Sequence, residues 1–292
     1  MNITKKNIWV ILAFLFPGLL IYIYLVLYPI GQSVVLSTFK WDTLASSRFV
    51  GLENYVTVFE SRLFWKSFTN SLIFMVATTA LQVIIGFILG YLVYLQLKGY
   101  RFFKVMYFVP TVLPSVAVGF IWNYIYSPGM GLLKPFMVAI GQAENYMPPL
   151  ASPTLALIAI IIAQTWHSCG VQVILFNSGF MSMPNEVIES ATIDGAGGIK
   201  MIYHMVIPLS WDIIKMVIIL QAVGALRSFD LVYVMTGGGP NHSTELLPLH
   251  LFVNSFQNFN LGYGNVIAVL IFVLAMTITL GLRKIMYKES IY

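Results

Sequence analysis

The stretch LIFMVATTALQVIIGFILGYLVYLQL, residues 72–97, decides the fold class of this chain. It contains no Asp, Glu, Lys or Arg, and its apolar residues run on continuously instead of alternating with polar ones. Alternation over segments of about 10 residues is typical of transmembrane β-strands, whereas about 20 continuous apolar residues can cross a bilayer as a helix. The stretch therefore predicts a transmembrane helix.

Five further stretches have the same character. Hydrophobic residues make up 59% of the 292-residue sequence and charged residues only 9%, compared with about 25% charged residues in a soluble domain. We therefore expect an all-α integral membrane protein, in which residues 1–292 form a single transmembrane domain. The six transmembrane helices are expected near residues 8–36, 68–95, 103–126, 153–177, 211–235 and 264–286.

Two of these helices have special features. The first follows Lys5 and Lys6 as a signal peptide would, but it is too long and lacks a small-x-small cleavage site, so we expect it to be retained. The third contains Pro110 and Pro114. Proline removes a helical hydrogen bond, so we expect this helix to be broken or kinked, as transporters often require.

The distribution of Lys and Arg predicts the orientation in the membrane. Six spans put both termini on the same side as the second and fourth connections. That side holds ten basic residues, namely Lys5, Lys6, Lys98, Arg101, Lys104, Lys200, Lys215, Arg283, Lys284 and Lys288. The opposite side holds five, namely Lys40, Arg48, Arg62, Lys66 and Lys134. By the positive-inside rule we expect a multi-pass protein of the cell membrane, plasma or inner, with both termini cytoplasmic.

The sequence offers little for catalysis. It has no GxxxxGK[ST] phosphate loop, no GxGxxG after a strand, no GxSxG elbow and no HExxH helix. Its four histidines lack metal spacing, and Cys169 is its only cysteine, which we interpret as a small packing residue. We therefore expect no catalytic residue, no metal site and no cofactor in this chain. The net charge of +5 reflects membrane topology and anionic lipid, and we expect no nucleic-acid partner.

One polar segment stands out between the fourth and fifth predicted helices. Residues 181–210, MSMPNEVIESATIDGAGGIKMIYHMVIPLS, are predicted to form a short helix, a turn and a second short helix on the cytoplasmic side. Ser182 or Asn185 could cap the first helix, and Glu186 and Glu189 lie early in it, where the helix dipole favours acids. After Asp194, Gly195 can take the positive φ that ends a helix. Pro208 closes the second piece.

This segment resembles a known family motif. Glu189-Ser190-Ala191, then Gly195, then Met205-Val206-Ile207-Pro208 is similar to the Glu-Ala-Ala loop of binding-protein-dependent ATP-binding cassette importers, and IDGAGG is similar to their carbohydrate-uptake branch. A second block, RSFDLVYVMTGGGPNHSTE at 227–245 with GYGNVIAVLIFVLAM after it, resembles the same branch, in the subunit type that pairs with a different permease. Ser190, Met205 and Ile207 replace the usual Ala, Ile and Leu conservatively.

The resemblance implies a role and a set of partners. In that family the loop is a coupling helix that docks in a cleft of a separate ATPase, which implies that ATP and magnesium are bound by partner chains. It also implies a second homologous permease, two cytoplasmic ATP-binding subunits, an extracellular solute-binding protein, membrane lipid and a sugar or oligosaccharide substrate. The residues that match this coupling role are Glu186, Glu189, Ala191, Asp194, Gly195 and Pro208.

Polar residues inside apolar spans indicate where a substrate could pass, because such groups are costly in lipid and usually face a cavity or a neighbour. Amides and hydroxyls beside aromatic rings favour sugars, and the alternative for any one residue is a hydrogen bond between helices. Arg227 and Asp230 could also pair with each other. The candidates are Asn123, Gln164, Gln172, Asn177, Gln221, Arg227, Ser228 and Asp230.

Three alternatives to a sugar importer are open at this stage. An importer of another polar solute, such as a glycerol phosphate, would share the same motifs. An ion-coupled secondary carrier would show acids in the centre of several helices and an inverted repeat, and neither is evident. A non-transporting membrane scaffold is disfavoured by the polar residues in the spans.

Overall fold

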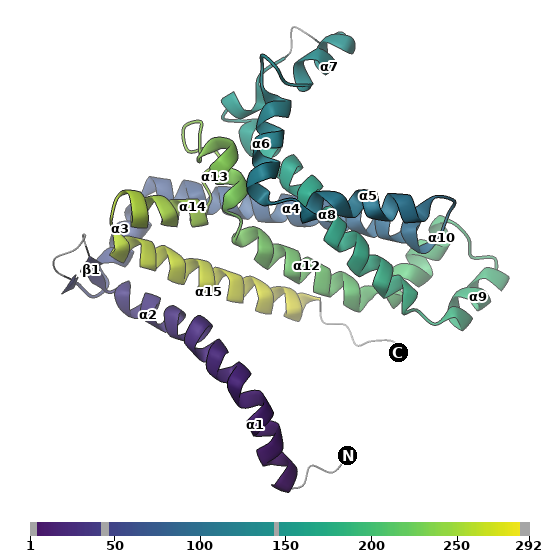
Figure 1. Ribbon diagram of the computed structural model, residues 1–292, viewed down its shortest axis with the longest axis horizontal. Helices are drawn as coiled ribbons and strands as arrows, with labels where there is room; N and C mark the ends of the chain where they lie inside the picture. The colour runs from purple at the N-terminus through teal and green to yellow at the C-terminus, as the bar shows by residue number, and fades with distance from the viewer. Residues whose placement is uncertain (1–4, 42–46, 143–145, 287–292) are drawn as a thin grey trace. The chain divides into compact units, whose positions relative to one another are not determined.

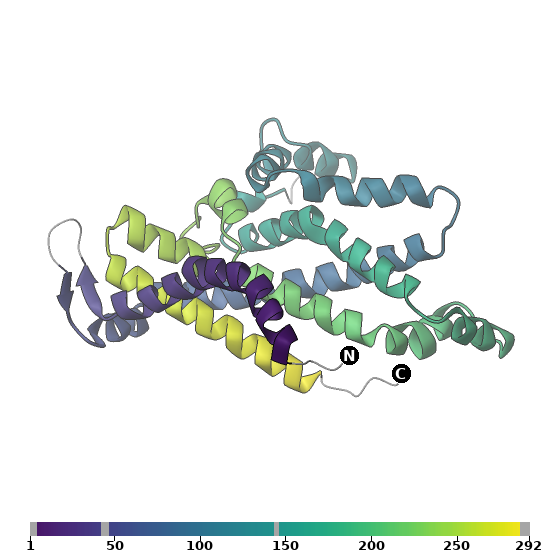
Figure 2. The same ribbon diagram turned by 60° about the horizontal axis from the view of Figure 1, so that its bottom comes forward.

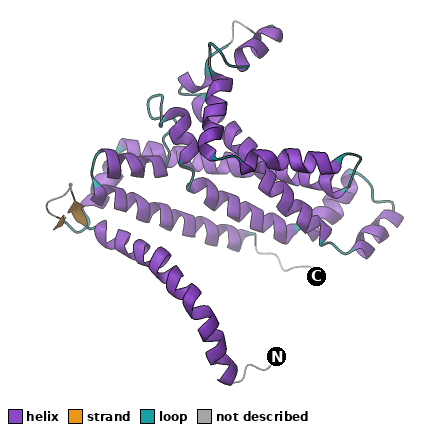
Figure 3. Ribbon diagram, in the orientation of Figure 1, coloured by secondary structure: helices purple, strands orange, loops and turns teal. Residues whose placement is uncertain are grey.

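The structure is a computed structural model, which describes residues 5–41, 47–142 and 146–286. Helices account for nearly all of its regular structure, and one antiparallel pair of short strands is the exception (Figure 3). The α-helices are α1 Lys5–Tyr22, α2 Tyr28–Leu36, α3 Glu53–Glu60, α4 Arg62–Tyr94, α5 Tyr100–Val112, α6 Ser115–Tyr126, α7 Leu133–Ala139, α8 Ala156–Met181, α9 Asn185–Ile193, α10 Ile199–Met201, α11 Ile207–Leu209, α12 Trp211–Leu226, α13 Asp230–Thr236, α14 Leu247–Phe252 and α15 Leu261–Ile285 (Figure 1). The strands are β1 Phe39–Trp41 and β2 Ser47–Phe49.

Within the described residues, four helices are long and apolar enough to cross a membrane: Ala13–Leu36, Arg62–Tyr94, Ala156–Met181 and Leu261–Ile285. Two further pairs qualify when each is taken together. Tyr100–Val112 and Ser115–Tyr126 meet at 101°, and Ile199–Leu209 and Trp211–Leu226 meet at 73°. Counting each bent pair as one span gives six, which agrees with the all-α membrane fold expected from the sequence.

Prolines explain where these helices bend. The third predicted helix is divided at Pro114, which precedes α6, so the expected break is confirmed. π-Helical turns at Ile23–Leu27 and Ile202–Val206 come shortly before Pro29 and Pro208. Proline has no N–H to donate to the carbonyl four residues earlier, and a wider turn is one way for the chain to accommodate that loss.

The fifth helix differs from its expected course over 211–235. α12 ends at Leu226, and the chain leaves the helix through Arg227 and Phe229 before α13 begins at Asp230. Phe229 has φ −130° and ψ −58°, outside helical geometry. Asp230 lies in the first turn of the new helix, where an acid is favourable. The predicted single helix is therefore two helices.

By its internal contacts the chain divides into two compact units, Met1–Arg62 with His250–Val273, and Leu63–Leu249 with Leu274–Tyr292. In the first, Asn54 of α3 holds the start of the hairpin by donating from Nδ2 to the carbonyl oxygens of Ser37 (2.8 Å) and Phe39 (2.9 Å). His250 Nε2 lies 3.2 Å from the hydroxyl of Tyr263 on α15. These contacts join segments that are distant in sequence.

The second unit is built on close helix packing. α8 contacts α5, α6, α12 and α13, and α5 runs beside α8 in Figure 2. Gly86 and Gly90 of α4, four residues apart, face α8 at Gln172 and Phe176, where a Cβ would have no room. Small residues at this spacing let two membrane helices approach closely. α8 is thereby held against α4 in the part of the unit that carries most of the candidate site residues.

Candidate functional site: the 181–210 segment and a row of intramembrane amides

The polar segment has the helix–turn–helix form expected from its sequence. α9 covers Asn185–Ile193, and α10, a π-helical turn and α11 follow from Ile199 to Leu209. The residue before α9 is Pro184, whereas Ser182 donates from Oγ to the carbonyl of Gly179 at the end of α8. The predicted cap at Ser182 or Asn185 is therefore wrong, because Pro184 extends the chain between the two helices.

A Schellman motif ends α9. The N–H of Ala196 donates to the carbonyl of Ala191 (2.9 Å), and the N–H of Gly195 donates to that of Thr192 (3.1 Å). Gly195 has φ +81°, as its sequence position predicted. Glycine suits this position because other L-residues pay a steric cost there. Gly195 thus sets the direction in which the chain leaves the helix.

The two faces of α9 differ. Ala191 is 8% exposed and packs, with Ile188 and Ala196, in an apolar cluster built on Phe176 and Phe180 of α8. Ala191 therefore packs on its own chain and does not lie on the outward face of α9. The outward face instead carries the exposed residues Glu186, Glu189, Ile193 and Asp194. Three acids thus lie beside an isoleucine that is 86% exposed.

Pro208 lies in the last short helix of the segment, just before a sharp bend. The chain turns at Ser210, which has φ −95° and ψ +11°, and α12 leaves at 73° to the preceding piece. The hydroxyl of Ser210 donates to the carbonyl of Val206 and is buried. The cluster that holds α9 also includes Val206 and Ile214 of α12. Displacement of α9 would therefore be transmitted to α8 and α12 through direct side-chain packing.

Four glutamines form a row across three helices. Gln82 of α4 donates from Nε2 to the carbonyl of Gln164 (3.3 Å), and Gln164 Nε2 donates to Ser168 Oγ (2.9 Å), both on α8. Gln172 lies one turn beyond Ser168 on α8. When its amide oxygen faces α12, this oxygen accepts a hydrogen bond from Nε2 of Gln221 on α12. The structure thus brings together three predicted candidates, Gln164, Gln172 and Gln221.

Sequence reasoning missed Gln82 of this row and Ser168, which accepts a hydrogen bond from Gln164. Gln82 is 2% exposed, and Ser168 lies between the other amides on α8. Gln82 is a polar residue inside the second predicted span, which is the criterion by which the other candidates were chosen. The sequence could therefore have predicted it. Ser168 gave a weaker signal, since serine is common in membrane helices and often bonds only to its own backbone.

Two asparagines lie apart from the row. Asn123 of α6 donates from Nδ2 to the carbonyl of Val234 on α13 (3.1 Å), while its buried Oδ1 has no protein partner. Asn177 is buried near the end of α8, with Nδ2 3.7 Å from the sulfur of Met181. An unpaired buried acceptor is costly unless a ligand or water satisfies it, so Asn123 is the better candidate for a ligand contact.

Aromatic rings adjoin Asn123. Trp122 packs edge-on against Trp166 of α8 (5.8 Å between centroids) and lies 5.2 Å from Tyr126. Its indole N–H is buried without a protein partner. Tyr124 and Trp166 remain partly or largely exposed. A flat apolar ring beside unpaired donors and acceptors is the chemistry that binds a sugar face.

Arg227, Ser228 and Asp230 lie at the break between α12 and α13, and not in a continuous helix. Arg227 and Asp230 are both exposed, and no ion pair joins them in this part of the structure. Because the helix ends at Leu226, the i,i+3 spacing no longer puts the two side chains on one helix face. The expected pairing is therefore absent, and both charges stand free to meet another chain, solvent or substrate.

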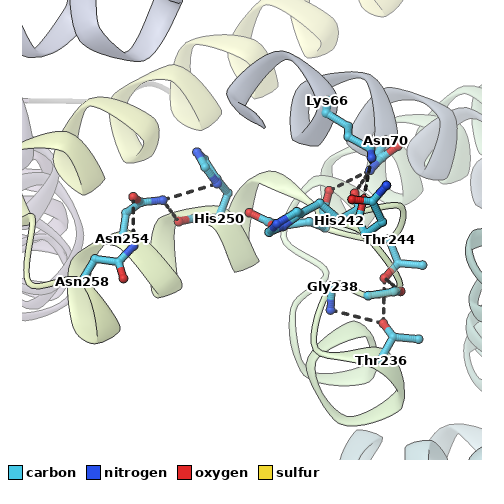
Figure 4. Close-up of polar contacts among 12 residues, drawn as sticks. Lys66, Asn70, Thr236, Gly238, His242, Thr244, His250, Asn254 and Asn258 are labelled. Carbon is cyan, nitrogen blue, oxygen red and sulfur yellow. Dashed lines mark hydrogen bonds and ion pairs between the residues drawn. The ribbon is translucent and has the colours of Figure 1, made fainter. Parts of the chain in front are cut away.

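The loop at 236–245 contains a polar network to which the sequence analysis had assigned no site residue. Thr236 and Thr244 share a 2.7 Å hydrogen bond, and Thr244 Oγ1 donates to the carbonyl of Gly239 (Figure 4). Lys66 of α4 donates to the carbonyl of Asn241 (2.6 Å), and Asn70 donates to that of Glu245 (3.1 Å) (Figure 4). The sequence feature that could have pointed to this loop is the GGGP run at 237–240, which lies in the block quoted in the sequence analysis.

These features define a class of protein. Bent spanning helices, buried amides between them and an exposed helical segment packed on two spans are typical of a membrane transport protein. No cluster of His, Cys, Asp and Glu suited to a metal ion occurs among the described residues. The chain belongs to the family of binding-protein-dependent transport system inner membrane components, whose model matches residues 82–289. It is a membrane-embedded permease subunit of the ATP-binding cassette type.

Individual relatives extend the comparison along almost the whole chain. The probable ABC transporter permease protein YurN of Bacillus subtilis is 30% identical over 93% of this chain and 94% of its own length. The multiple sugar-binding transport system permease protein MsmF of Streptococcus mutans is 29% identical over 90% of each. A chain of a bacterial alginate ABC transporter, solved with an alginate pentasaccharide-bound periplasmic protein, superposes with TM-score 0.81 at 17% identity over 96% of this chain and 94% of that one. That likeness shows the shared fold.

Proposed function

We propose that this chain is one permease subunit of an ATP-driven importer that moves a sugar or oligosaccharide across the cell membrane. The observation that carries the proposal is the family match over residues 82–289, which contains both the 181–210 segment and the row of amides. Relatives described as multiple sugar-binding and alginate transporters support the choice of substrate class. The amide row and the Trp122–Trp166 pair supply suitable chemistry.

The second part of the proposal concerns energy and partners. The 181–210 segment docks in a cleft of a separate ATPase through the outward face of α9, with Glu186, Glu189 and Asp194 as its charges. Two such ATPases bind ATP and magnesium, and this chain itself hydrolyses nothing. A second homologous permease completes the path, and an extracellular solute-binding protein delivers the sugar. Both termini and the coupling segment are on the cytoplasmic side, as the ten-to-five distribution of basic residues favours.

We expect a movement of α9 to be passed on to the spanning helices on which it packs. Its buried face is packed on Phe176 and Phe180 of α8 and, through Val206, on Ile214 of α12. Closure of the ATPases would move α9 and, with it, α8 and α12. Those two helices carry Gln172 and Gln221, so the movement changes the spacing of the amides. Polar contacts that open and close in this way can release a bound sugar to one side.

The test is transport by the assembled complex. The two permeases and the ATPases are reconstituted in vesicles, and the binding protein is added on the extracellular side. The vesicles should accumulate radiolabelled sugar only when ATP is present on the cytoplasmic side. Uptake should persist when proton and sodium gradients are collapsed. Gradient-dependent uptake without ATP would contradict the proposal in favour of a secondary carrier. Uptake of glycerol phosphate but of no sugar would contradict the substrate class alone.

A separate measurement addresses the claim that the chain is not catalytic. The purified subunit alone should show no ATP hydrolysis above a mock preparation, since its sequence lacks a phosphate loop. ATP hydrolysis should appear when the ATPase subunits are added. Saturable hydrolysis by the clean single chain would contradict this part of the proposal.

A further inference from the structure

A groove lies on the surface between α5 and α8, away from the amide row and the coupling segment. It has a volume of about 430 Å³. Its walls are apolar and one end is charged: Val105, Phe108, Val109 and Val112 of α5, Ile174 of α8, and Lys104 at the end. Gly170 lets α5 and α8 touch near Tyr107 and Phe108, beside the groove. The groove is a shallow, open hollow that follows α5, and Ile174 is the α8 residue that borders it.

The charged end belongs to a basic group without acids. Lys98, Arg101 and Lys104 follow one another over seven residues, and no Asp or Glu occurs from residue 61 to residue 142 or within α8. Among the described residues, the ion pairs join Asp212 to Lys215 and His242 to Glu245, so none of the three bases is paired with a carboxylate. Arg101 is exposed and bonds only to the hydroxyl of its neighbour Tyr100 (3.2 Å).

We propose that this groove binds one anionic phospholipid, with an acyl chain along α5 and the phosphate headgroup at Lys104, Arg101 and Lys98. An apolar groove in a spanning segment suits an acyl chain, because filling it buries no unpaired polar group. Unpaired bases at its end provide the charge complementarity that a neutral lipid lacks, and each such base contributes to anionic-lipid binding. If the termini are cytoplasmic, the lipid belongs to the inner leaflet; that detail rests on the proposed function, whereas the site does not.

The position of the groove gives the lipid a possible effect. α5 lies against α8, and α8 carries both Gln172 of the amide row and Phe176 of the apolar cluster that holds α9. A lipid seated on α5 and against Ile174 would therefore stabilise one arrangement of α8, the helix that connects the two functional regions. The expected consequence is thermal stabilisation of the chain by anionic lipid.

The experiment uses the full-length chain in a mild detergent, titrated with phosphatidylglycerol and with phosphatidylcholine of identical acyl chains. Bound lipid is counted by native mass spectrometry, and unfolding is followed by intrinsic fluorescence. Glycerophosphoglycerol, which has the headgroup without acyl chains, separates lipid binding from simple phosphate binding. The variants are Lys104→Gln, which removes the charge, and Val109→Trp, which fills the groove. Lys284→Gln is the matched control, an exposed lysine in the last turn of α15.

The wild-type chain should bind phosphatidylglycerol more tightly than phosphatidylcholine and should bind glycerophosphoglycerol at least tenfold more weakly. Lys104→Gln should weaken phosphatidylglycerol binding about fivefold, Val109→Trp should reduce binding of both lipids, and Lys284→Gln should change neither. Equal binding of the two lipids, or no effect of either groove variant, would overturn the proposal. So would loss of the second permease from the Val109→Trp complex with lipid binding unchanged, because the groove would then be a subunit interface.

Discussion

The N–H of Ala196 donates a 2.9 Å hydrogen bond to the carbonyl of Ala191, and Gly195 between them holds a φ of +81°. This relationship ends α9 and fixes the position of its outward face. Apart from the adjoining residues of the chain, no heavy atom lies within 4 Å of a Cβ built on Gly195 or on Gly197, and the φ of Gly197 is not positive. Both glycines have room for a side chain, and they differ in backbone conformation.

The first prediction uses that difference. Gly195→Asp should abolish most uptake, because it adds a charge at the proposed docking turn and also some backbone strain. The strain is below the roughly 1–2 kcal/mol of most residues, because Asp tolerates a left-handed conformation. Gly197→Asp adds the same charge without the strain and should retain more uptake. Both proteins should insert and keep wild-type helix content by circular dichroism. Uptake at the wild-type rate in Gly195→Asp would show that this turn does not carry the coupling.

A second prediction concerns the exposed acid Glu189. Glu189→Lys should weaken co-purification of the ATPase, because it removes an attraction and adds a repulsion, whereas Glu189→Gln should have a smaller effect. A reversed charge on the ATPase cleft should recover part of the loss for Glu189→Lys only. The measurement is the amount of ATPase retained on the immobilised permease. Normal retention of the ATPase by Glu189→Lys would rule out the proposed contact.

The third prediction follows from the break between α12 and α13. Since Arg227 and Asp230 are exposed and form no ion pair, Arg227→Gln and Asp230→Asn should have additive effects on stability, within about 0.5 kcal/mol. A double-mutant cycle on thermal unfolding measures this. A coupling above about 1 kcal/mol would mean that the two side chains pair in the assembled protein.

Close packing of α4 on α8 gives the fourth prediction. A Cβ on Gly90 would lie 2.8 Å from Cβ of Phe176 and 3.1 Å from the carbonyl of Val173, so Gly90→Ala must push two helices apart. We expect a cost of about 1–3 kcal/mol, seen as a lower unfolding midpoint in detergent. Gly281→Ala in α15, where a Cβ meets nothing, is the control and should be neutral or slightly stabilising. Equal midpoints for the two variants would contradict this packing.

The fifth prediction tests Asn123 as a substrate contact. Asn123→Leu should raise the sugar concentration for half-maximal uptake about tenfold, because the unpaired Oδ1 offers one hydrogen bond worth about 1.5 kcal/mol. Asn265→Leu is the control, since Nδ2 of Asn265 donates to the carbonyl of Leu261 in its own helix. An unchanged half-saturation concentration in Asn123→Leu would remove this residue from the path.

Several local features of the site could be read from the sequence. Gly195 was identified from its position after Asp194, and the broken third helix from Pro114, because turns and proline breaks depend on one or two residues. The orientation of Ala191 could not be read in the same way. A small residue in an amphipathic segment suits either face, and its burial depends on Phe176 and Phe180 of α8, which are close only in space.

The sequence by itself determined that this is a helical membrane protein with a polar segment at 181–210, because apolar length and polarity are properties of the chain alone. The tertiary structure decided which polar residues meet. Gln82 of α4 reaches Gln164 of α8 across 82 residues. Gln172 meets Gln221 because α12 packs on α8. The end of α12 at Leu226 separates Arg227 from Asp230. Hydrogen bonds between helices depend on packing distance and rotation, which no local pattern specifies.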